Sequence, residues 1–403
     1  MSVLSYLEKL LDGVDVEWLS LGSIAVIKTG QSVNKKMISD NSGKYPVINS
    51  GRAPLGFIDT WNTDDDPIGI TTRGAGVGSI TWQDGRYFRG NLNYSVTIKK
   101  DCSIKVRYMY HLLLQMQKDI QELCTFDGIP ALNASNLKRL QIPIPCPDTP
   151  EKSLAIQSEI VRILDKFTAL TAELTAELTA RKKQYNYYRD QLLSFEEGDV
   201  EWKTLGEIGT WHGGGTPSKS RSEFWENGSI PWISPKDMGR PIVDTSEDYI
   251  TEEAVQQSST KLVPANSIAI VVRSSILDKV MPGALIPVPA TFNQDMKVVI
   301  PHCNISPNYI AHIMRSRGGD ILRAAKKSGG SVASIDSKKL FSFRIPVPHL
   351  NEQKRIVNIL DKFDTLANSI TEGLPREIEL RQKQYEYYRD LLFSFPKPDY
   401  VTN

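Results

Sequence analysis

The chain has 403 residues, of which 40% are hydrophobic, and its 48 basic side chains almost balance its 47 acidic ones. This length exceeds that of one ordinary domain. No run of about 18 apolar residues occurs, so hydropathy excludes a transmembrane helix. The near-neutral charge argues against a strong non-specific polyanion binder, and nucleic-acid binding would require basic residues focused on particular faces.

The segment at the start of the chain, MSVLSYLEKLLDG, lacks the basic and long apolar regions of a signal peptide, so we expect a cytoplasmic protein. The four cysteines form no CxxC pair and the five histidines are scattered. We therefore expect reduced thiols and no metal site.

Residues 1–18 end in DVEW, a tetrapeptide that returns at residues 199–202. The segment before it resembles QLLSFEEGDVEW, which follows the first of two long helices described below. We expect residues 1–18 to complete the distal end of the second helix, which would give a pseudo-circular chain with Leu7 near Leu392.

Residues 19–148 form a first variable module. Its β-branched runs at 45–50, 68–72 and 79–82 and a short helical pattern at 108–116 predict a mixed α/β fold. The module ends in LKRLQIPIP at 137–145, where prolines favour an edge strand because they cannot donate to a central ladder.

The glycine-rich stretch Arg73–Gly78 predicts a tight turn, because it lacks both the last glycine of GxGxxG and a Walker A lysine. Arginine can bind guanine, asparagine can bind adenine, and lysine can hold phosphate. The candidate DNA contacts of this module are Lys35, Lys36, Arg73, Arg86, Arg89 and Asn93.

Residues 149–196 predict one long helix, because apolar residues recur at three- and four-residue spacing with no glycine or proline between Glu151 and Phe195. Within it, residues 171–178 read TAELTAEL. Each four-residue unit of a helix adds about 6 Å and about 40° beyond a full turn. The tandem is interpreted as a helical spacer.

Residues 197–348 form a second variable module, which resembles the first only weakly and also ends in alternating Ile/Val-Pro. Strands are predicted at 267–272 and 298–301, with helices near 308–316 and 320–326. Gly213–Pro217 predicts a turn that could approach DNA closely. The candidate DNA contacts here are Lys219, Arg221, Lys236, Arg240, Arg273, Ser274, Lys279, Asn293 and Gln294.

Residues 349–403 contain a second long helix that nearly repeats the first: IVNILDKF at 356–363 repeats IVRILDKF at 160–167, and RQKQYEYYRD at 381–390 repeats RKKQYNYYRD at 181–190. The step Gly373–Pro375 predicts a break. We expect the two helices to pair as an antiparallel coiled coil about a pseudo-twofold axis, with the variable modules at opposite ends.

The duplicated tyrosines of these helices have two interpretations that the sequence leaves open. They could pack the end of the coiled coil, or they could form two equivalent docking sites for two copies of one partner. These tyrosines are Tyr185, Tyr187, Tyr188, Tyr385, Tyr387 and Tyr388.

With these features together, the whole chain resembles the specificity subunits of type I restriction-modification systems, especially the IC class. The matching features are the two modules, the ILDKF and QYxYYRD helices, the TAEL tandem and GGGTPS…FWENGSIPWISPKDM at 213–238. The resemblance implies an α+β protein whose modules are target recognition domains, each reading one half of an asymmetric, bipartite double-stranded DNA site.

The resemblance also implies that the helices set the spacer and bind two methyltransferase subunits, with two motor-nuclease subunits completing the bacterial enzyme. Consistent with this, the sequence offers no catalytic constellation and no adenine-methylation tetrad. The chain is then non-catalytic, and S-adenosylmethionine, ATP and Mg²⁺ belong to the partners. Two alternatives remain: a two-module protein-interaction scaffold, and the specificity subunit of a stand-alone adenine methyltransferase.

Overall fold

The computed structural model describes the chain except residues 1–9, 11–12, 52, 330, 369–371 and 397–403. The chain forms two compact units. Unit 1 comprises residues 1–175 and 377–403, and unit 2 comprises residues 176–376. Each unit contains one variable module and parts of the long helices, so the helices belong to the units and are not a separate domain.

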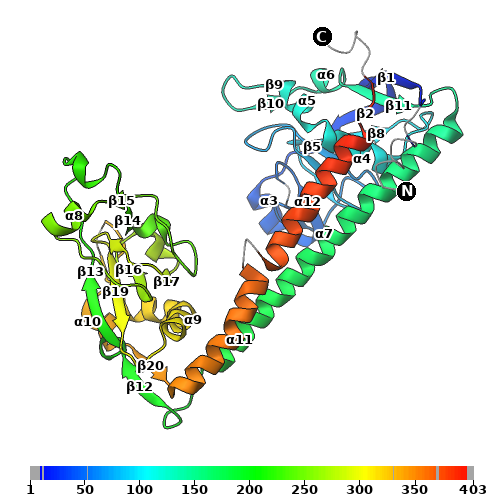
Figure 1. Ribbon diagram of the computed structural model, residues 1–403. Coiled ribbons are helices and arrows are strands. Elements are labelled where there is room, and N and C mark those ends of the chain that lie inside the picture. The colour runs from blue at the N-terminus through cyan, green and yellow to red at the C-terminus, as the bar shows by residue number, and fades with distance from the viewer. Residues whose placement is uncertain (1–9, 11–12, 52, 330, 369–371, 397–403) are drawn as a thin grey trace. The chain divides into compact units, whose positions relative to one another are not determined.

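The first module is a mixed α/β fold, as predicted (Figure 1). Its elements are β1 (Val16–Ser20), α2 (Leu21–Ile24), β2 (Ala25–Thr29), α3 (Lys35–Asp40), β3 (Ser42–Ile48), β4 (Phe57–Ile58), β5 (Ile68–Thr71), β6 (Ile80–Trp82), β7 (Phe88–Arg89), β8 (Asn93–Ile98), α4 (Val106–Gln115), α5 (Gln117–Glu122), β9 (Cys124–Thr125), β10 (Ala131–Leu132), α6 (Ala134–Leu137) and β11 (Gln141–Pro145).

The second module contains β12 (Glu201–Thr204), η1 (Leu205–Glu207), β13 (Gly209–Gly213), η2 (Ser222–Phe224), β14 (Ile230–Ile233), η3 (Pro235–Asp237), β15 (Tyr249–Ile250), α8 (Glu252–Gln257), β16 (Ser267–Val271), η4 (Ser275–Asp278), β17 (Gly283–Ile286), β18 (Thr291–Phe292), β19 (Met296–Pro301), α9 (Pro307–Ala325), α10 (Ser337–Ser342) and β20 (Arg344–Val347). The two predicted helices at 308–326 are one helix, α9.

The two modules share one topology although their sequences differ. A four-stranded sheet has the order β2-β8-β5-β6 in the first module and β13-β19-β16-β17 in the second. A three-stranded sheet has the order β4-β3-β7 in one and β15-β14-β18 in the other. In both, a parallel pair joins the middle strand to a short third strand.

The proline-containing exit strands are edge strands, as predicted. β11 pairs with β1, and β20 pairs with β12, each in a two-stranded antiparallel sheet. An exit strand in such a pair needs to donate hydrogen bonds on one side only, which tolerates the missing amides of Pro143 and Pro145. These pairs close each module at its junction with a long helix.

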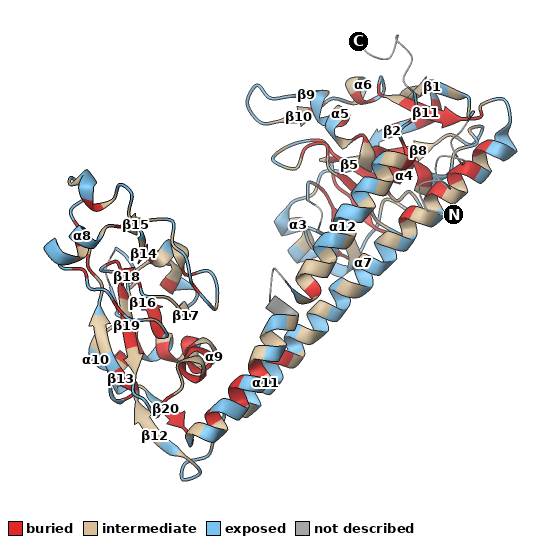
Figure 2. Ribbon diagram, viewed as in Figure 1, coloured by how far each residue is buried: buried red, intermediate tan, exposed pale blue. Residues whose placement is uncertain are grey.

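The first long helix, α7 (Pro150–Leu192), runs without interruption through the TAEL tandem, as predicted. The boundary between the units falls inside this tandem, at Thr175. Leu174 and Leu178 are half-buried, and the other tandem residues from 172 to 177 are exposed, as the pale stretch of α7 shows (Figure 2). The tandem therefore contributes little to either hydrophobic core.

The second long helix is broken, as predicted, into α11 (Leu350–Asn368) and α12 (Gly373–Leu392). Gly373 adopts φ +74°, and a Cβ added there would lie 2.6 Å from the Thr365 carbonyl oxygen. This backbone region favours glycine, and Pro375 follows in the first turn of α12 because a proline amide there has no helical acceptor.

The helices pair antiparallel, which confirms the predicted direction. In unit 1, Phe167 of α7 stacks on Tyr388 of α12, with ring centroids 5.2 Å apart. In unit 2, Tyr188 of α7 stacks on Phe363 of α11 at 5.7 Å. Along α7 the residue number rises while that of the partner falls. The same two residue types of the repeat thus form the same stacked pair once in each unit.

The N-terminal segment joins the C-terminal one within unit 1. Leu10 and Val14 pack against the cluster that buries Leu392 and Phe393, and the Trp18 indole Nε1 donates to the Pro396 carbonyl at 3.0 Å. The described part of residues 1–18 thus contacts the C-terminal end, and Leu7, expected near Leu392, lies outside the described residues.

Candidate nucleic-acid interface

Arg73 and Arg273 occupy the same position in the two modules. Each follows the central strand of the four-stranded sheet, β5 or β16, and each is exposed. Arg73 forms an isolated bridge with Ala131, and Arg273 forms one with Ser334. The backbone is therefore fixed while the guanidinium groups stay reachable by a ligand.

Arg89 and Asn93 are internal, which corrects their prediction as DNA contacts. Arg89 is 3% exposed, and its guanidinium donates to the carbonyls of Asp66, Ile68 and Tyr94 and to the Asn93 side chain at 2.6–3.1 Å. Burial lowers the pKa of Arg89. These two residues tie the loop at Asp66 to the sheet and are unavailable to DNA.

The other cations of the first module lie on its surface. Lys35 and Lys36 are exposed in the first turn of α3, whose N-terminus is capped by the Asn34 side chain at 2.8 Å from the Met37 amide. Arg86 is exposed, pairs with Asp64 at 3.0 Å and lies 4.6 Å from the centroid of the Trp61 ring. The guanidinium therefore lies within cation–π distance of an exposed aromatic ring.

Three cations of the second module are paired with acids of the same module. Lys236 lies between Glu247 at 2.9 Å and Asp248 at 3.0 Å, and these hydrogen bonds raise its pKa. Arg221 pairs with Glu223 at 2.7 Å. Arg240 lies 3.7 Å from Asp244. A phosphate would have to compete with these carboxylates, which weakens the three residues as phosphate contacts.

The remaining candidates of the second module divide into accessible and inaccessible residues. Lys219, Lys279 and Gln294 are exposed. Ser274 caps η4 through the Ile276 amide at 3.4 Å. Asn293 is buried and accepts from the Asp295 amide at 2.7 Å, so its prediction as a DNA contact is also corrected.

Within the predicted 213–217 turn, Gly214 is required because the backbone at Asn293 passes very close to it. A Cβ on Gly214 would lie 1.9 Å from the Asn293 carbonyl oxygen. The neighbouring chain segment, rather than a nucleic acid, therefore accounts for glycine at this position.

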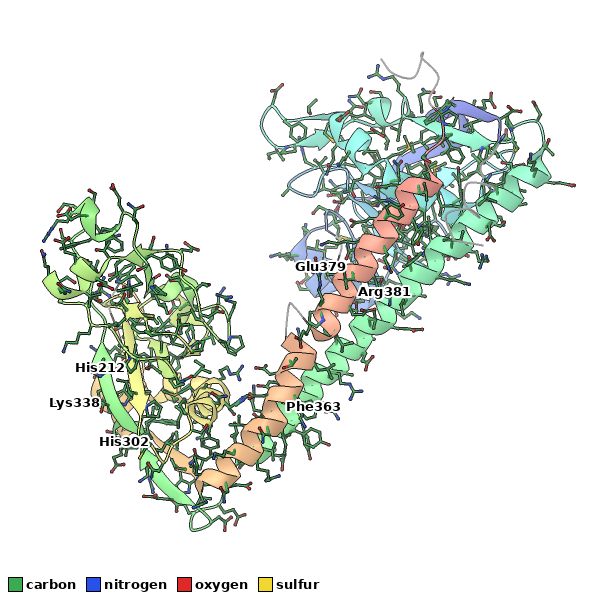
Figure 3. All side chains as sticks on the ribbon, in the orientation of Figure 1. His212, His302, Lys338, Phe363, Glu379 and Arg381 are labelled. Atoms are coloured by element: carbon green, nitrogen blue, oxygen red, sulfur yellow. The ribbon has the colours of Figure 1, made fainter. Side chains whose placement is uncertain are left out.

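The six candidate docking tyrosines have three different environments. Tyr185 is buried in the core of unit 2, and Tyr385 donates its hydroxyl to His111 Nδ1 at 2.9 Å in unit 1. Tyr188 and Tyr388 form the stacked pairs with Phe363, labelled on α11 in Figure 3, and Phe167. The packing interpretation thus holds for these four tyrosines, and the docking interpretation stays a prediction for the other two.

Tyr187 and Tyr387 are the most exposed members, with 62% and 55% of their surface accessible, whereas the stacked Tyr188 keeps 42%. In unit 1, Tyr387 lines a groove on α12 together with Leu380 and Arg381, the latter labelled in Figure 3. On α7, Ile163, Phe167 and Leu170 line an apolar groove. The duplicated helices therefore keep partly exposed aromatic and apolar side chains on their surface, although Ile163 also packs against the core of unit 1.

A repeated amide clamp fastens each module to its helix, and the sequence analysis missed it. Gln157 accepts from the Lys105 amide at 2.8 Å and donates to the Ser103 carbonyl at 3.0 Å. Gln353 accepts from the Ser306 amide at 2.8 Å and donates to the Pro348 carbonyl at 2.8 Å. Both glutamines stand three residues before the repeated IVxILDKF, which was the available signal.

A buried histidine in each module reaches the aspartate of the ILDKF repeat, a second contact that the sequence analysis missed. His111 Nε2 lies 2.8 Å from Asp165, and His312 Nε2 lies 2.8 Å from Asp361. In both, the other ring nitrogen faces a donor, Tyr385 in unit 1 and Arg315 in unit 2. The network therefore assigns neutral rings protonated at Nε2.

Two features are absent from the described residues. No helix among them is long and apolar enough to cross a membrane. In the same part of the chain, no three His, Cys, Asp or Glu side chains gather as metal ligands would.

Comparison with known proteins assigns the family. The "Type I restriction modification DNA specificity domain" matches residues 13–181 and again 197–380. Over 415 residues the chain is 64% identical to the "Type I restriction enzyme EcoR124I/EcoR124II specificity subunit" of Escherichia coli, covering 100% of both chains. It is 34% identical over 407 residues to the EcoprrI specificity subunit of Escherichia coli, covering 92% of this chain and 93% of that one.

A solved structure shows the same fold. The type I restriction-modification S subunit from M. genitalium superimposes with a TM-score of 0.60 at 19% identity, covering 96% of this chain and 98% of that one. With the domain present twice along its length, the chain belongs to the family of type I restriction-modification specificity subunits.

Proposed function

We propose that this chain is the non-catalytic, DNA-reading subunit of a type I restriction-modification complex in the bacterial cytoplasm. Each module reads one half of a bipartite site on double-stranded DNA. The observation that carries this is the combination of one shared topology with different surface chemistry, held by duplicated helices. Such a molecule performs one task twice, on two different targets.

The two half-sites differ, because the accessible groups of the two modules differ. The first module presents Lys35, Lys36, Arg73 and Arg86. The second presents Lys219, Arg273, Lys279 and Gln294. Only the arginine after the central strand is common to both. Different donors and acceptors recognise different base edges, so the whole target is asymmetric.

Two methyltransferase subunits bind the duplicated helices in this proposal, and the exposed Tyr187 and Tyr387 mark equivalent docking positions. Exposed tyrosines beside arginine, as at Arg381, suit a protein interface. Two motor-nuclease subunits complete the enzyme. The partners supply the chemistry, with S-adenosylmethionine in the methyltransferase and ATP with Mg²⁺ in the motor-nuclease.

The TAEL tandem sets the spacer between the half-sites in this proposal, as in the IC class that the sequence resembles. Support comes from the uninterrupted helix through residues 171–178 and from the boundary between the units at Thr175. A helical segment with few tertiary contacts can change length without disturbing either core.

The test is co-expression of the chain with the methyltransferase encoded beside it, followed by genome-wide mapping of methylated adenines. We expect a split, asymmetric motif with a fixed spacer. A properly assembled complex that methylates no defined motif would contradict the proposal and favour the protein-interaction scaffold. A split motif without a motor-nuclease partner would identify a stand-alone methyltransferase system.

A further inference from the structure

The β9–β10 hairpin of the first module exposes two large apolar side chains at its tip. Phe126 is 62% exposed and Ile129 is 66% exposed, while Cys124 and Leu132 at the base of the hairpin are buried. The tip turns at Gly128, whose φ is +95°. Figure 1 shows the hairpin projecting from its module. The isolated chain gains no stability from exposing these side chains.

The base of the hairpin is fixed beside Arg73. The Leu132 amide donates to the Thr72 carbonyl at 2.8 Å, and the Gly74 amide donates to the Pro130 carbonyl at 2.9 Å. Antiparallel pairing of Cys124–Thr125 with Ala131–Leu132 completes the attachment. These bonds hold the tip in place, so its side chains can be presented to a ligand at a small entropic cost.

The second module fastens a loop at the same topological position with the same bonds. The Ile335 amide donates to the Val272 carbonyl at 2.8 Å, and the Ser274 amide donates to the Ala333 carbonyl at 3.0 Å. This loop also lies beside the exposed arginine, Arg273. An exposed arginine and a loop hydrogen-bonded beside it thus lie at equivalent positions in the two modules.

The chemistry of the two tips differs. Phe126-Asp-Gly-Ile129 carries an aromatic ring, an isoleucine and one carboxylate, whereas the second loop exposes Lys327, Ser328 and Ser331 and keeps only the smaller Val332, 39% exposed, at the position of Ile129. A surface for a partner shared by both halves would repeat, as Tyr187 and Tyr387 do. A surface that differs between the halves instead matches the element that distinguishes the two half-sites.

We propose that the Phe126–Ile129 tip is a base-contacting element of the first module, which deepens the proposed DNA-reading function and rests on it. Phe126 and Ile129 lie against bases in the groove, and Arg73 beside them binds a phosphate or a guanine edge. Asp127 disfavours a phosphate neighbour but can accept from the amino group of cytosine or adenine. The tip therefore faces bases, with Arg73 supplying the cationic anchor.

The test uses the double variant Phe126→Ala/Ile129→Ala, co-expressed with the neighbouring methyltransferase. Adenine methylation is mapped genome-wide, and the affinity of the purified complex for a duplex carrying the wild-type motif is measured by competition. Val26→Ala, at an exposed position of β2 in the same module, is the matched control. Denaturant unfolding checks that the variants fold.

We expect base preference to relax in one half-site only, with affinity falling on the order of tenfold, since losing recognition at one base pair costs about 1–3 kcal/mol. The other half-site, methyltransferase retention and the Val26→Ala control should be unchanged. An unchanged motif and affinity would overturn the proposal. Loss of methyltransferase with an unchanged motif would also overturn it and assign the tip to a protein interface. A wild-type complex without a split motif would remove the proposed function itself.

Discussion

The amide clamp gives the sharpest stability prediction. Gln157→Ala leaves the Lys105 amide and the Ser103 carbonyl without their partner in a site where Gln157 is 0% exposed. Each unsatisfied buried group costs roughly 1–3 kcal/mol. We therefore expect a loss of about 2–4 kcal/mol for unit 1, a large share of the roughly 5–15 kcal/mol typical of a folded domain.

The assay is urea unfolding of the co-expressed complex, followed by hydrogen exchange. With a urea slope of about 2 kcal/mol per molar, the midpoint of unit 1 should fall by about 1–2 M. Exchange at the Lys105 amide should accelerate. Gln353→Ala should produce the corresponding loss in unit 2, because it removes the partner of the Ser306 amide.

Gln384→Ala is the matched control, because Gln384 lies exposed on α12 and accepts a hydrogen bond only from Arg381 among the described residues. Its effect should stay within about 0.5 kcal/mol. If Gln157→Ala were as mild as this control, the clamp would not hold the module to the helix. A loss equal in both units for Gln157→Ala would likewise contradict a local role.

Four other predictions concern protonation, assembly, recognition and spacing. Burial lowers the pKa of His111 to about 4 in the folded protein, below its value of about 6.5 in the unfolded chain. The unfolded chain therefore binds the proton more readily, and unit 1 loses stability as the pH falls from about 6.5 to about 4. His111→Gln should flatten that slope in unfolding measured from pH 7.5 to 4.5, and an unchanged slope would assign it to another group. The double variant Tyr187→Ala/Tyr387→Ala should reduce the number of methyltransferase copies in native mass spectra without lowering the unfolding midpoint. Tyr388→Ala should lower the midpoint instead, because it removes the stack on Phe167. Retained stoichiometry in the double variant would rule out docking at Tyr187 and Tyr387. Arg73→Ala or Arg273→Ala should cost about 1–3 kcal/mol in DNA binding with relaxed preference at one base, and an equal loss on all sequences would mark a phosphate contact. Deleting Thr175–Leu178 removes about 6 Å of helix and should shorten the preferred spacer while both half-sites persist, so altered half-site bases would refute the spacer role.

The helices and edge strands could be predicted from the sequence because their signals are local. The apolar spacing of residues 149–196 needs only neighbouring turns, and the break at Gly373–Pro375 follows from the backbone limits of those two residues. The proline pattern of 141–145 likewise restricts the strand to an edge. In each case the signal lies within the segment whose structure it predicts.

The identity of accessible side chains could not be predicted, because it depends on distant contacts. Arg89 and Arg73 look equivalent in the sequence, yet Arg89 is enclosed by the carbonyls of Asp66, Ile68 and Tyr94, whereas Arg73 is exposed. Lys236 is paired with acids eleven and twelve positions away, as its contacts with Glu247 and Asp248 show. Residue type gives the chemistry of a contact, and only the fold gives its availability.

The Trp18–Pro396 hydrogen bond has a consequence for synthesis. Unit 2 is one continuous stretch, residues 176–376, whereas unit 1 combines residues 1–175 with 377–403. Domains fold as units while the chain grows. The second module can therefore complete its unit first, while the first module waits for Leu392 and Phe393, which are buried in its core. The module made earliest is the one finished last.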